Sequence, residues 1–208
     1  MAKKSVSGEI RNKEKTKQKL LHAVRKIITA KGHSKVKVNT VAEVSGVNKR
    51  LIYDYFGGLD GLIDAYISQV DYWNRLRNAD SMIKEDNGQQ FTIDMLLGLF
   101  DAMQKDKEMQ KIIVWELSEY RRSLRAAADK REEDGELIFG SVIDPYFGNH
   151  AGRFRAITAL LISGAYYLTI HTEVNGGTFC GLDLKSENGR NEIREAIRFV
   201  IKQAYETV

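Results

Sequence analysis

The three- and four-residue spacing of apolar side chains is the feature that most constrains this fold. It recurs along most of the chain, as in the stripe Leu20, Val24, Ile27 and Ile28, and side chains at that spacing share one face of a helix. Only one proline, Pro145, is present to interrupt a helix. No segment shows a convincing alternation of apolar and polar residues, which a half-buried strand requires. The sequence therefore predicts an all-α fold.

Glycines and capping residues divide this pattern into separate helices. Gly32, Gly46 and Gly57 are expected to end the first three, because glycine adopts the left-handed conformation that terminates a helix. Thr40 has capping-box spacing to the glutamate three residues later, and Asn48 is the expected N-cap of the third helix. The expected helices cover about residues 11–31, 38–45, 48–56, 60–80, 90–104, 107–120, 122–147, 152–174 and 190–206.

Charge is distributed unevenly along the chain. Residues 1–62 contain 14 Lys or Arg and 5 Asp or Glu, a net charge of +9, whereas the rest of the chain carries −5. A basic segment joined to an acidic body is typical of a polyanion-binding module with a second function. A charge run can also be only a solvated surface, so charge alone does not decide between the two interpretations.

Membrane insertion and disulfide bonding are not expected. The N-terminal sequence is charged and lacks the apolar region of a signal peptide. The most apolar run, residues 156–170, contains 15 residues, whereas a membrane span needs about 20. The single cysteine, Cys180, cannot form an internal disulfide and fits a reducing compartment. We expect a soluble, cytoplasmic protein that does not bind a membrane.

The segment VAEVSGVNKRLIYDYFGGLDGL, residues 41–62, contains a glycine turn between two short helices. This is the layout of a helix-turn-helix, whose second helix enters the major groove of DNA. Many helical hairpins with a glycine turn bind nothing, but the basic flank and the aromatic pair Tyr53 and Tyr55 favour DNA. We expect a flexible basic tail at residues 1–10, a DNA-binding domain at 11–58 and a larger helical body at 59–208.

The expected DNA-binding residues combine base-reading and phosphate-contacting chemistry. Arg and Lys suit the guanine acceptors, Asn suits adenine, and an apolar side chain suits a thymine methyl. Tyrosine hydroxyls, a threonine hydroxyl and the free amides at a helix start bind phosphates and fix register. The set is Lys37, Thr40, Asn48, Lys49, Arg50, Leu51, Tyr53 and Tyr55.

The same segment resembles the tetracycline-repressor (TetR) family of transcriptional regulators. The family pattern places an apolar-alanine pair, a glycine-valine pair, a cap, a tyrosine and a phenylalanine at fixed spacing. The matching residues here are Val41, Ala42, Gly46, Val47, Asn48, Tyr53 and Phe56, followed by Leu62. The specific resemblance covers about residues 14–62, and beyond it only length and helical layout agree.

Three departures from the family pattern bear on DNA contacts. Asn48 replaces the usual serine or threonine cap, and Arg50 and Leu51 stand where glycine and threonine are frequent. Leu59 stands where the family commonly has a lysine that contacts phosphate. A leucine cannot make that contact, so Lys35, Lys37 or the N-terminal tail would have to replace it.

The resemblance implies a homodimer whose last two helices form a four-helix interface. Residues 152–174 are apolar nearly all round, and a helix of that kind must contact more than its own core. Residues 190–206 carry a second apolar stripe. A buried central helix in a monomer is the alternative for residues 152–174. Between the two helices lies a long glycine-rich loop, and loops of this length in compact domains usually have a functional role.

The resemblance further implies a ligand pocket in the body for an unidentified small-molecule effector. Aromatic and methionine side chains at helical spacing are usually core residues, which is the alternative for each candidate. Glu116 is the most suggestive, because a carboxylate in an apolar setting needs a partner, either a cationic ligand, a neighbouring arginine or solvent. The candidates are Trp73, Phe91, Met95, Phe100, Met103, Trp115, Glu116, Tyr120, Tyr166 and His171.

An enzyme is not expected, because the chain has no nucleophile motif and no phosphate-binding loop. Its histidines show no metal-ligand spacing, so neither a metal nor another cofactor is expected. The leading hypothesis is a ligand-responsive dimeric repressor that binds a pseudopalindromic DNA operator. The alternative is an interaction protein of the same fold that acts through a protein partner and binds DNA weakly or without sequence preference.

Overall fold

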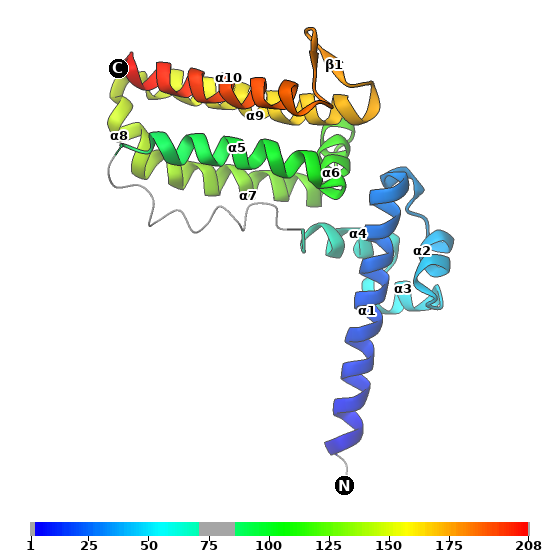
Figure 1. The fold of residues 1–208 in the computed structure, drawn as a ribbon. Coiled ribbons are helices and arrows are strands. Elements are labelled where there is room, and N and C mark those ends of the chain that lie inside the picture. Colours follow the sequence, from blue (N-terminus) through cyan, green and yellow to red (C-terminus); the bar gives the residue numbers. More distant parts are fainter. Residues whose placement is uncertain (1–2, 71–85, 208) are drawn as a thin grey trace. The chain divides into compact units, whose positions relative to one another are not determined.

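The computed structural model describes residues 3–70 and 86–207. These residues are almost wholly helical, which confirms the all-α prediction (Figure 1). Contacts divide the chain into two compact units. We name them the head unit, Met1–Asp71 with Lys111–Ala128, and the body unit, Tyr72–Gln110 with Asp129–Val208. The division does not fall at residue 58, since the head unit also takes in a fourth helix and residues 111–128.

The head unit is built on four helices, α1 (Lys3–Lys31), α2 (Val38–Ser45), α3 (Arg50–Phe56) and α4 (Leu59–Ile67), with a 3-10 turn at His33–Lys35. Helix α1 contacts α2 and α4, and α3 contacts α4. The side chains that meet are fully or almost fully buried, because apolar residues at helical spacing form one face on each helix. They include Leu20, Val24, Ile28, Val41, Ile52 and Leu62.

Three expectations about the head helices are corrected. Helix α1 begins at Lys3, so the predicted flexible tail continues the helix over residues 3–10. Helix α2 begins at Val38 after the extended residue Lys37, which places Thr40 inside its first turn, so the predicted capping box does not form. Helix α4 ends at Ile67, and the predicted extension to residue 80 falls mostly outside the described residues.

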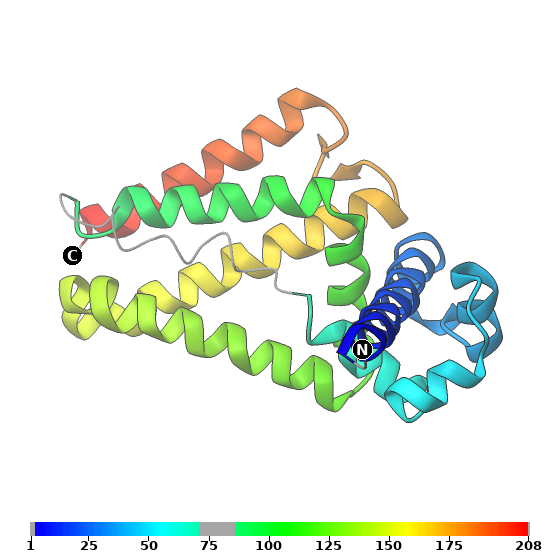
Figure 2. The same ribbon diagram turned by 90° about the horizontal axis from the view of Figure 1, so that it is seen from below.

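The body unit contains α5 (Gln89–Lys105), α8 (Asp144–Phe147), α9 (Ala151–Val174) and α10 (Glu187–Glu206). Helices α6 (Lys107–Ser118) and α7 (Arg122–Ile138) pass from one unit to the other along the chain. Helix α5 packs against α9 and α10 (Figures 1 and 2). Its stripe of Ile93, Leu96 and Phe100 is buried, as are Ile197 and Ile201 on α10.

The predicted helix over residues 122–147 is interrupted. Helix α7 ends at Ile138, and a wider π-helical turn, Phe139–Ile143, leads into α8. Pro145 lies in the first turn of α8, where the missing N–H of proline costs no hydrogen bond. A 3-10 turn, Gly148–His150, then precedes α9.

A two-stranded hairpin occupies part of the loop before α10, where no strand was predicted. Strands β1 (Thr178–Phe179) and β2 (Leu182–Asp183) are antiparallel, with Thr178 opposite Asp183. Cys180 and Gly181 between them have φ of 50° and 79°, the sign that a type I′ turn requires at both positions. Two-residue strands are too short to produce an alternating pattern, so no sequence signal predicts them.

Aromatic rings on α8 and α9 surround Tyr205 near the end of α10. Tyr205 packs among Tyr146, Phe147 and Phe154, with ring centroids 4.8–5.4 Å from its own. Its hydroxyl donates a hydrogen bond to the Asn87 carbonyl at 3.1 Å. The cluster therefore fixes α10 at this end of the body unit.

Within residues 3–70 and 86–207, no helix has the length and apolar character needed to cross a membrane. Over the same residues, His, Cys, Asp and Glu side chains form no group of three or more that could hold a metal ion.

Candidate nucleic-acid interface

Helix α3 presents one buried side and one open side. Ile52 is fully buried and holds the helix in the head unit. Lys49, Arg50 and Tyr53 are exposed, with 55% of Tyr53 accessible. The Arg50 Nε lies 3.9 Å from a carboxylate oxygen of Asp54 one turn later, and 85% of the Arg50 side chain is exposed. The guanidinium is thus oriented by a weak surface pair and remains accessible to a partner.

Asn48 caps the start of α3, as predicted. Its Oδ1 accepts a hydrogen bond from the Arg50 amide at 2.9 Å, and its carbonyl accepts one from the Leu51 amide at 3.0 Å. Because Oδ1 already serves the helix, bidentate pairing of Asn48 with adenine would compete with the cap. The accessible donors at this helix start are therefore dominated by Lys49 and Arg50.

The turn between α2 and α3 depends on Gly46. Its φ of 65° lies in the left-handed region and ends α2, which a residue with a side chain adopts only at a cost. Ser45 Oγ then accepts a hydrogen bond from the Val47 amide at 3.2 Å. These local contacts fix the angle at which α3 leaves the turn.

A close approach between α3 and α4 requires Gly61. A Cβ on this residue would lie 1.9 Å from the carbonyl oxygen of Phe56, far inside contact distance. Only glycine lets α4 start this close to the end of α3. The orientation of α3 in the head unit is therefore set at both of its ends.

Six of the eight predicted DNA-binding residues lie on α3 or just before it, and the other two lie at the start of α2. Lys37, Asn48, Lys49, Arg50 and Tyr53 are exposed. Thr40, Leu51 and Tyr55 are half-buried.

The half-buried Tyr55 has a neighbour that the sequence did not indicate. The Lys13 ammonium of α1 lies 5.4 Å from the centroid of the Tyr55 ring, a cation–π distance. The only sequence signal that involves Lys13 is the general excess of basic residues over residues 1–62. That excess does not predict which lysine contacts Tyr55.

Trp115, a predicted ligand-binding residue, lies instead in the head unit. It is 2% exposed, and its ring stacks on His33 with centroids 4.7 Å apart. Its Nε1 donates to Glu119. His33 begins the 3-10 turn between α1 and α2, so Trp115 packs against this turn. A contact between residues this far apart in the chain leaves no local sequence signal.

Arg121 makes a second long-range contact in the head unit. Its Nε donates to a carboxylate oxygen of Asp64 at 2.9 Å, and its two terminal nitrogens donate to the carboxylate and the carbonyl of Asp60 at 3.1 and 2.9 Å. The guanidinium thereby ties the segment after α6 to the start of α4. The sequence indicated a neighbouring arginine only as a partner of Glu116, and no pattern pointed to the contact of Arg121 with α4.

The other predicted ligand-binding residues do not gather at one place. Phe91, Met95, Phe100 and Met103 are buried on α5, Glu116, Tyr166 and His171 are half-buried, and Tyr120 is 83% exposed. His171 lies beside the rings of Tyr167 and Phe179, and its buried Nδ1 has no hydrogen-bond partner among the described residues. Trp73 lies outside the described residues.

A cavity of about 290 Å³ is present in the body unit. Its lining comes from α5, α6, α9, the segment after β2 and the start of α10, and Phe100 is the only predicted ligand-binding residue in it. The lining residues are Phe100, Gln104, Gln110, Leu168, Thr169, Thr172, Glu173, Leu184, Lys185 and Arg190. Sequence reasoning missed the polar members because a glutamine or threonine on a helix carries no distinctive pattern.

Comparisons with known proteins agree with this geometry. Residues 20–66 match the sequence model of the bacterial regulatory proteins of the tetR family, and these residues include α2, α3 and nearly all of α4. Comparison with curated protein sequences gave no significant match.

Two crystal structures of NalD, the secondary repressor of the MexAB-OprM multidrug efflux pump in Pseudomonas aeruginosa, share the fold. The native structure is 16% identical, with a TM-score of 0.56 over 93% of this chain and 96% of NalD. The other is 18% identical, with a TM-score of 0.53 over 89% and 96%. The matched family consists of regulatory proteins, in agreement with the expectation of a regulator instead of an enzyme. The chain therefore resembles the tetR family of bacterial regulatory proteins, by sequence at residues 20–66 and by fold over most of its length.

Proposed function

We propose that this protein is a sequence-specific transcriptional regulator, a homodimeric repressor that binds a pseudopalindromic operator and is released by a small-molecule effector. The observation that carries the proposal is the free side of α3. Asn48 caps this short helix, Ile52 buries its inner side, and Lys49, Arg50 and Tyr53 remain accessible on the outside. A recognition helix needs this combination, because base edges are read from its N-terminal residues.

The proposed contacts divide into base readers and phosphate anchors. Arg50 and Lys49 supply the donors that suit guanine O6 and N7. Tyr53, with Lys37 and Thr40 at the start of α2, supplies groups that suit phosphates. The exposed Arg50 therefore sets sequence preference, and the others set register.

The proposed dimer uses α9 and α10, which expose large apolar side chains in the single chain. Leu160, Tyr167 and Val174 on α9 are 74%, 54% and 64% exposed, and Phe199 on α10 is 64% exposed. Residues 160, 167 and 174 are seven apart and share one helix face. A two-fold pair would bury this stripe and would place two heads on half-sites separated by about 34–36 Å.

Repression and release follow if two conformers of the dimer differ in head spacing. An effector shifts their populations only if it binds them unequally. The effector therefore has to prefer the conformer whose heads do not fit the operator.

Selection of bound fragments from a random DNA pool, followed by affinity measurement at two salt concentrations, tests the proposal. We expect a two-fold symmetric consensus that is bound far more tightly than bulk DNA at both concentrations. Affinity that disappears as salt rises, without an enriched sequence, would mean that the basic head binds only by phosphate contacts.

That negative result would favour an interaction protein that acts through a protein partner. One residue favours this second candidate, since Leu59 is half-buried at the start of α4 and cannot supply the phosphate-contacting ammonium that the resemblance implies there. Such a protein would bind DNA weakly and equally across sequences, and a tight protein partner would accompany it in pull-downs.

A further inference from the structure

The cavity in the body unit is lined by both apolar and polar side chains. Phe100 on α5 and Leu184 after β2 are 2% and 5% exposed, and Leu168 on α9 completes the apolar side. The polar lining residues are Gln104, Gln110, Thr169, Thr172, Glu173, Lys185 and Arg190. A pocket with this distribution orients a small molecule by a few polar groups while its apolar part is buried.

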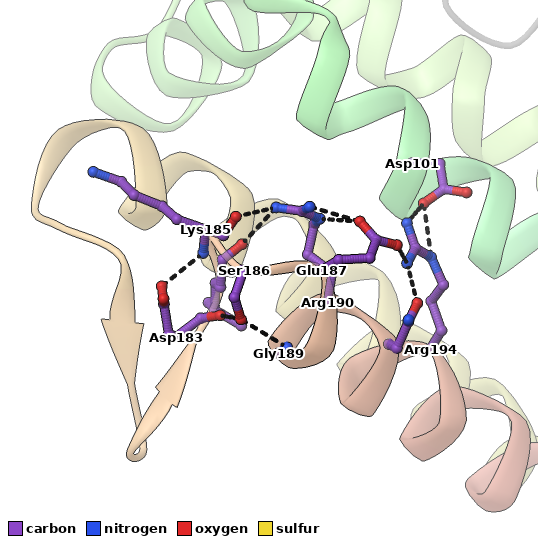
Figure 3. A network of polar contacts seen from close by, with 10 residues as sticks. Asp101, Asp183, Lys185, Ser186, Glu187, Gly189, Arg190 and Arg194 are labelled. Carbon is purple, nitrogen blue, oxygen red and sulfur yellow. Dashed lines mark hydrogen bonds and ion pairs between the residues drawn. The ribbon is translucent and has the colours of Figure 1, made fainter.

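Hydrogen bonds hold one wall of the cavity in place (Figure 3). Arg190 donates to the carbonyls of Leu184 and Lys185 at 3.4 and 2.5 Å and to the Glu187 carboxylate at 2.6 Å. Arg194 joins the same Glu187 to Asp101 of α5, 2.7 Å away. Hydrogen bonds from Arg190 and Arg194 lower the pKa of Glu187, so the carboxylate stays ionised. The wall is therefore formed in advance, and the charge of Arg190 is already neutralised.

Most other polar groups of the lining are also occupied. The Gln110 Nε2 donates to the Met103 carbonyl at 2.6 Å, and the Thr169 hydroxyl donates to the Ala165 carbonyl at 2.7 Å. Glu173 forms an ion pair with Lys107. These groups shape the cavity, but they are not the ones that a ligand would find unpaired.

Two donors remain. The Gln104 Nε2 is buried and has no hydrogen-bond partner, and leaving a buried donor unpaired is unfavourable. Lys185 is exposed, its ammonium has no ion-pair partner among the described residues, and its side chain extends away from the Glu187–Arg190 pair (Figure 3). The buried Gln104 donor therefore lacks an acceptor, and the exposed Lys185 supplies a positive charge near it in the lining.

We propose that this cavity binds a compact monocarboxylate with an apolar body, whose oxygens accept from Gln104 and Lys185 while its body covers Phe100 and Leu184. A cation would find no unpaired carboxylate among the described lining residues, because Glu173 is held by Lys107. A polyanion would find only one cation without an ion-pair partner among the described lining residues, Lys185, and the Glu173 carboxylate in the same lining would repel it. Its role as the effector site rests on the proposed function, whereas binding itself does not.

Three probes with one carbon skeleton test the charge preference. Phenylacetate, phenylacetamide and phenethylamine present an anion, a neutral amide and a cation. In NMR titrations of the full chain, we expect saturable shifts of the Gln104 side-chain amide and of residues around it. The expected order of affinity is phenylacetate, then phenylacetamide, with phenethylamine not binding. Equal affinity for all three, or no saturation by any of them, would overturn the proposal and leave a cavity that holds only water.

Two variants test the two donors separately. Gln104→Leu removes the unpaired donor, so the unliganded protein should melt at the same temperature or higher while phenylacetate binding weakens about ten-fold. Lys185→Gln keeps most of the stem but removes the charge, and it should weaken phenylacetate about three-fold, with no effect on phenylacetamide. Lys202→Gln, exposed on α10 and outside the lining, is the matched control and should bind like the wild type. Unchanged phenylacetate affinity in both Gln104→Leu and Lys185→Gln would refute the assignment.

Release of operator DNA is measured separately. If phenylacetate binds as described and also lowers operator affinity in the wild type but not in Gln104→Leu, the site is regulatory. If it binds but no operator is found, the proposed function fails while the carboxylate site stands. If an operator is bound but the probes do not bind, the site fails while the regulator stands.

Discussion

Arg50 and Tyr53 lie three residues apart on α3 and have different expected roles in DNA binding. Both side chains are exposed, but their chemistry differs, because a guanidinium can pair with two guanine acceptors and a phenol hydroxyl suits a phosphate. Arg50→Ala should therefore cost about 1–3 kcal/mol at the best site and flatten the difference between sites. Tyr53→Phe should weaken all sites alike. Binding of each variant to a panel of single-base operator changes measures both effects, and parallel losses in the two variants would contradict the division of roles.

Tyr205 gives a pH-dependent prediction at the same scale. Burial raises the pKa of Tyr205 to about 12, above its ordinary value of 10. The neutral phenol therefore stabilises the folded state fully below about pH 10, and this contribution is lost as pH rises from about 10 to 12. Tyr205→Phe also loses the hydrogen bond to Asn87, so it should be less stable than the wild type at pH 8 by about 1 kcal/mol.

Denaturant unfolding of both proteins between pH 8 and pH 12 checks this. Other tyrosines and lysines titrate in the same range, so the informative quantity is the difference between the two proteins. That difference should narrow as pH rises. A constant difference would show that Tyr205 ionises with the same pKa in the folded and unfolded states.

At the scale of elements, the contact between α3 and α4 depends on the absence of a side chain at Gly61. Because a Cβ there would lie 1.9 Å from the Phe56 carbonyl, Gly61→Ala must move one helix away from the other. We expect a loss of about 1–3 kcal/mol in stability and a clear loss of operator affinity. Gly98→Ala is the control, since Gly98 lies inside α5 with no atom near its would-be Cβ, and it should be neutral or stabilising. Thermal unfolding and operator binding of both variants decide the point, and a normal Gly61→Ala protein would show that the helices adjust freely.

Arg121 provides a second test at this scale, because one guanidinium bonds to both Asp60 and Asp64 of α4. Arg121→Ala should destabilise the head unit by about 1–2 kcal/mol, less than a buried network would, since both carboxylates are exposed. Arg122→Ala next to it removes an exposed arginine and should be close to neutral. Hydrogen exchange of α4 amides compares the two, and equal protection in both variants would mean that Arg121 contributes nothing to holding α4.

For the whole molecule, the exposed apolar stripe on α9 and α10 predicts assembly. Leu160→Asp and Phe199→Asp each place a charge in the proposed interface, so either variant should sediment as a monomer and bind the operator much more weakly. Leu137→Asp on α7 is the control, because Leu137 is 72% exposed but outside the proposed interface. Sedimentation of all three variants beside the wild type tests this. A wild-type monomer, or a dimer that tolerates both interface changes, would contradict the proposed assembly.

The sequence by itself determined the local features of the protein. Periodic apolar residues, the Asn48 cap and the left-handed Gly46 act over a few residues, so the helices of the head and the N-terminal end of α3 followed from them. Local patterns did not predict the hairpin, because its two-residue strands are too short to show an alternation. They also predicted a capping box at Thr40, whereas α2 begins two residues earlier, at Val38.

Tertiary structure alone decided which distant residues meet. His33 stacks on Trp115, Arg121 reaches α4, and Arg194 on α10 joins Asp101 on α5, although each pair is far apart in the chain. Such contacts depend on how whole helices pack, and no rule that acts over one or two turns can specify them. For the same reason an aromatic expected in a ligand pocket lies in the head unit, and the cavity is lined by glutamine, threonine and lysine side chains that no sequence pattern had marked.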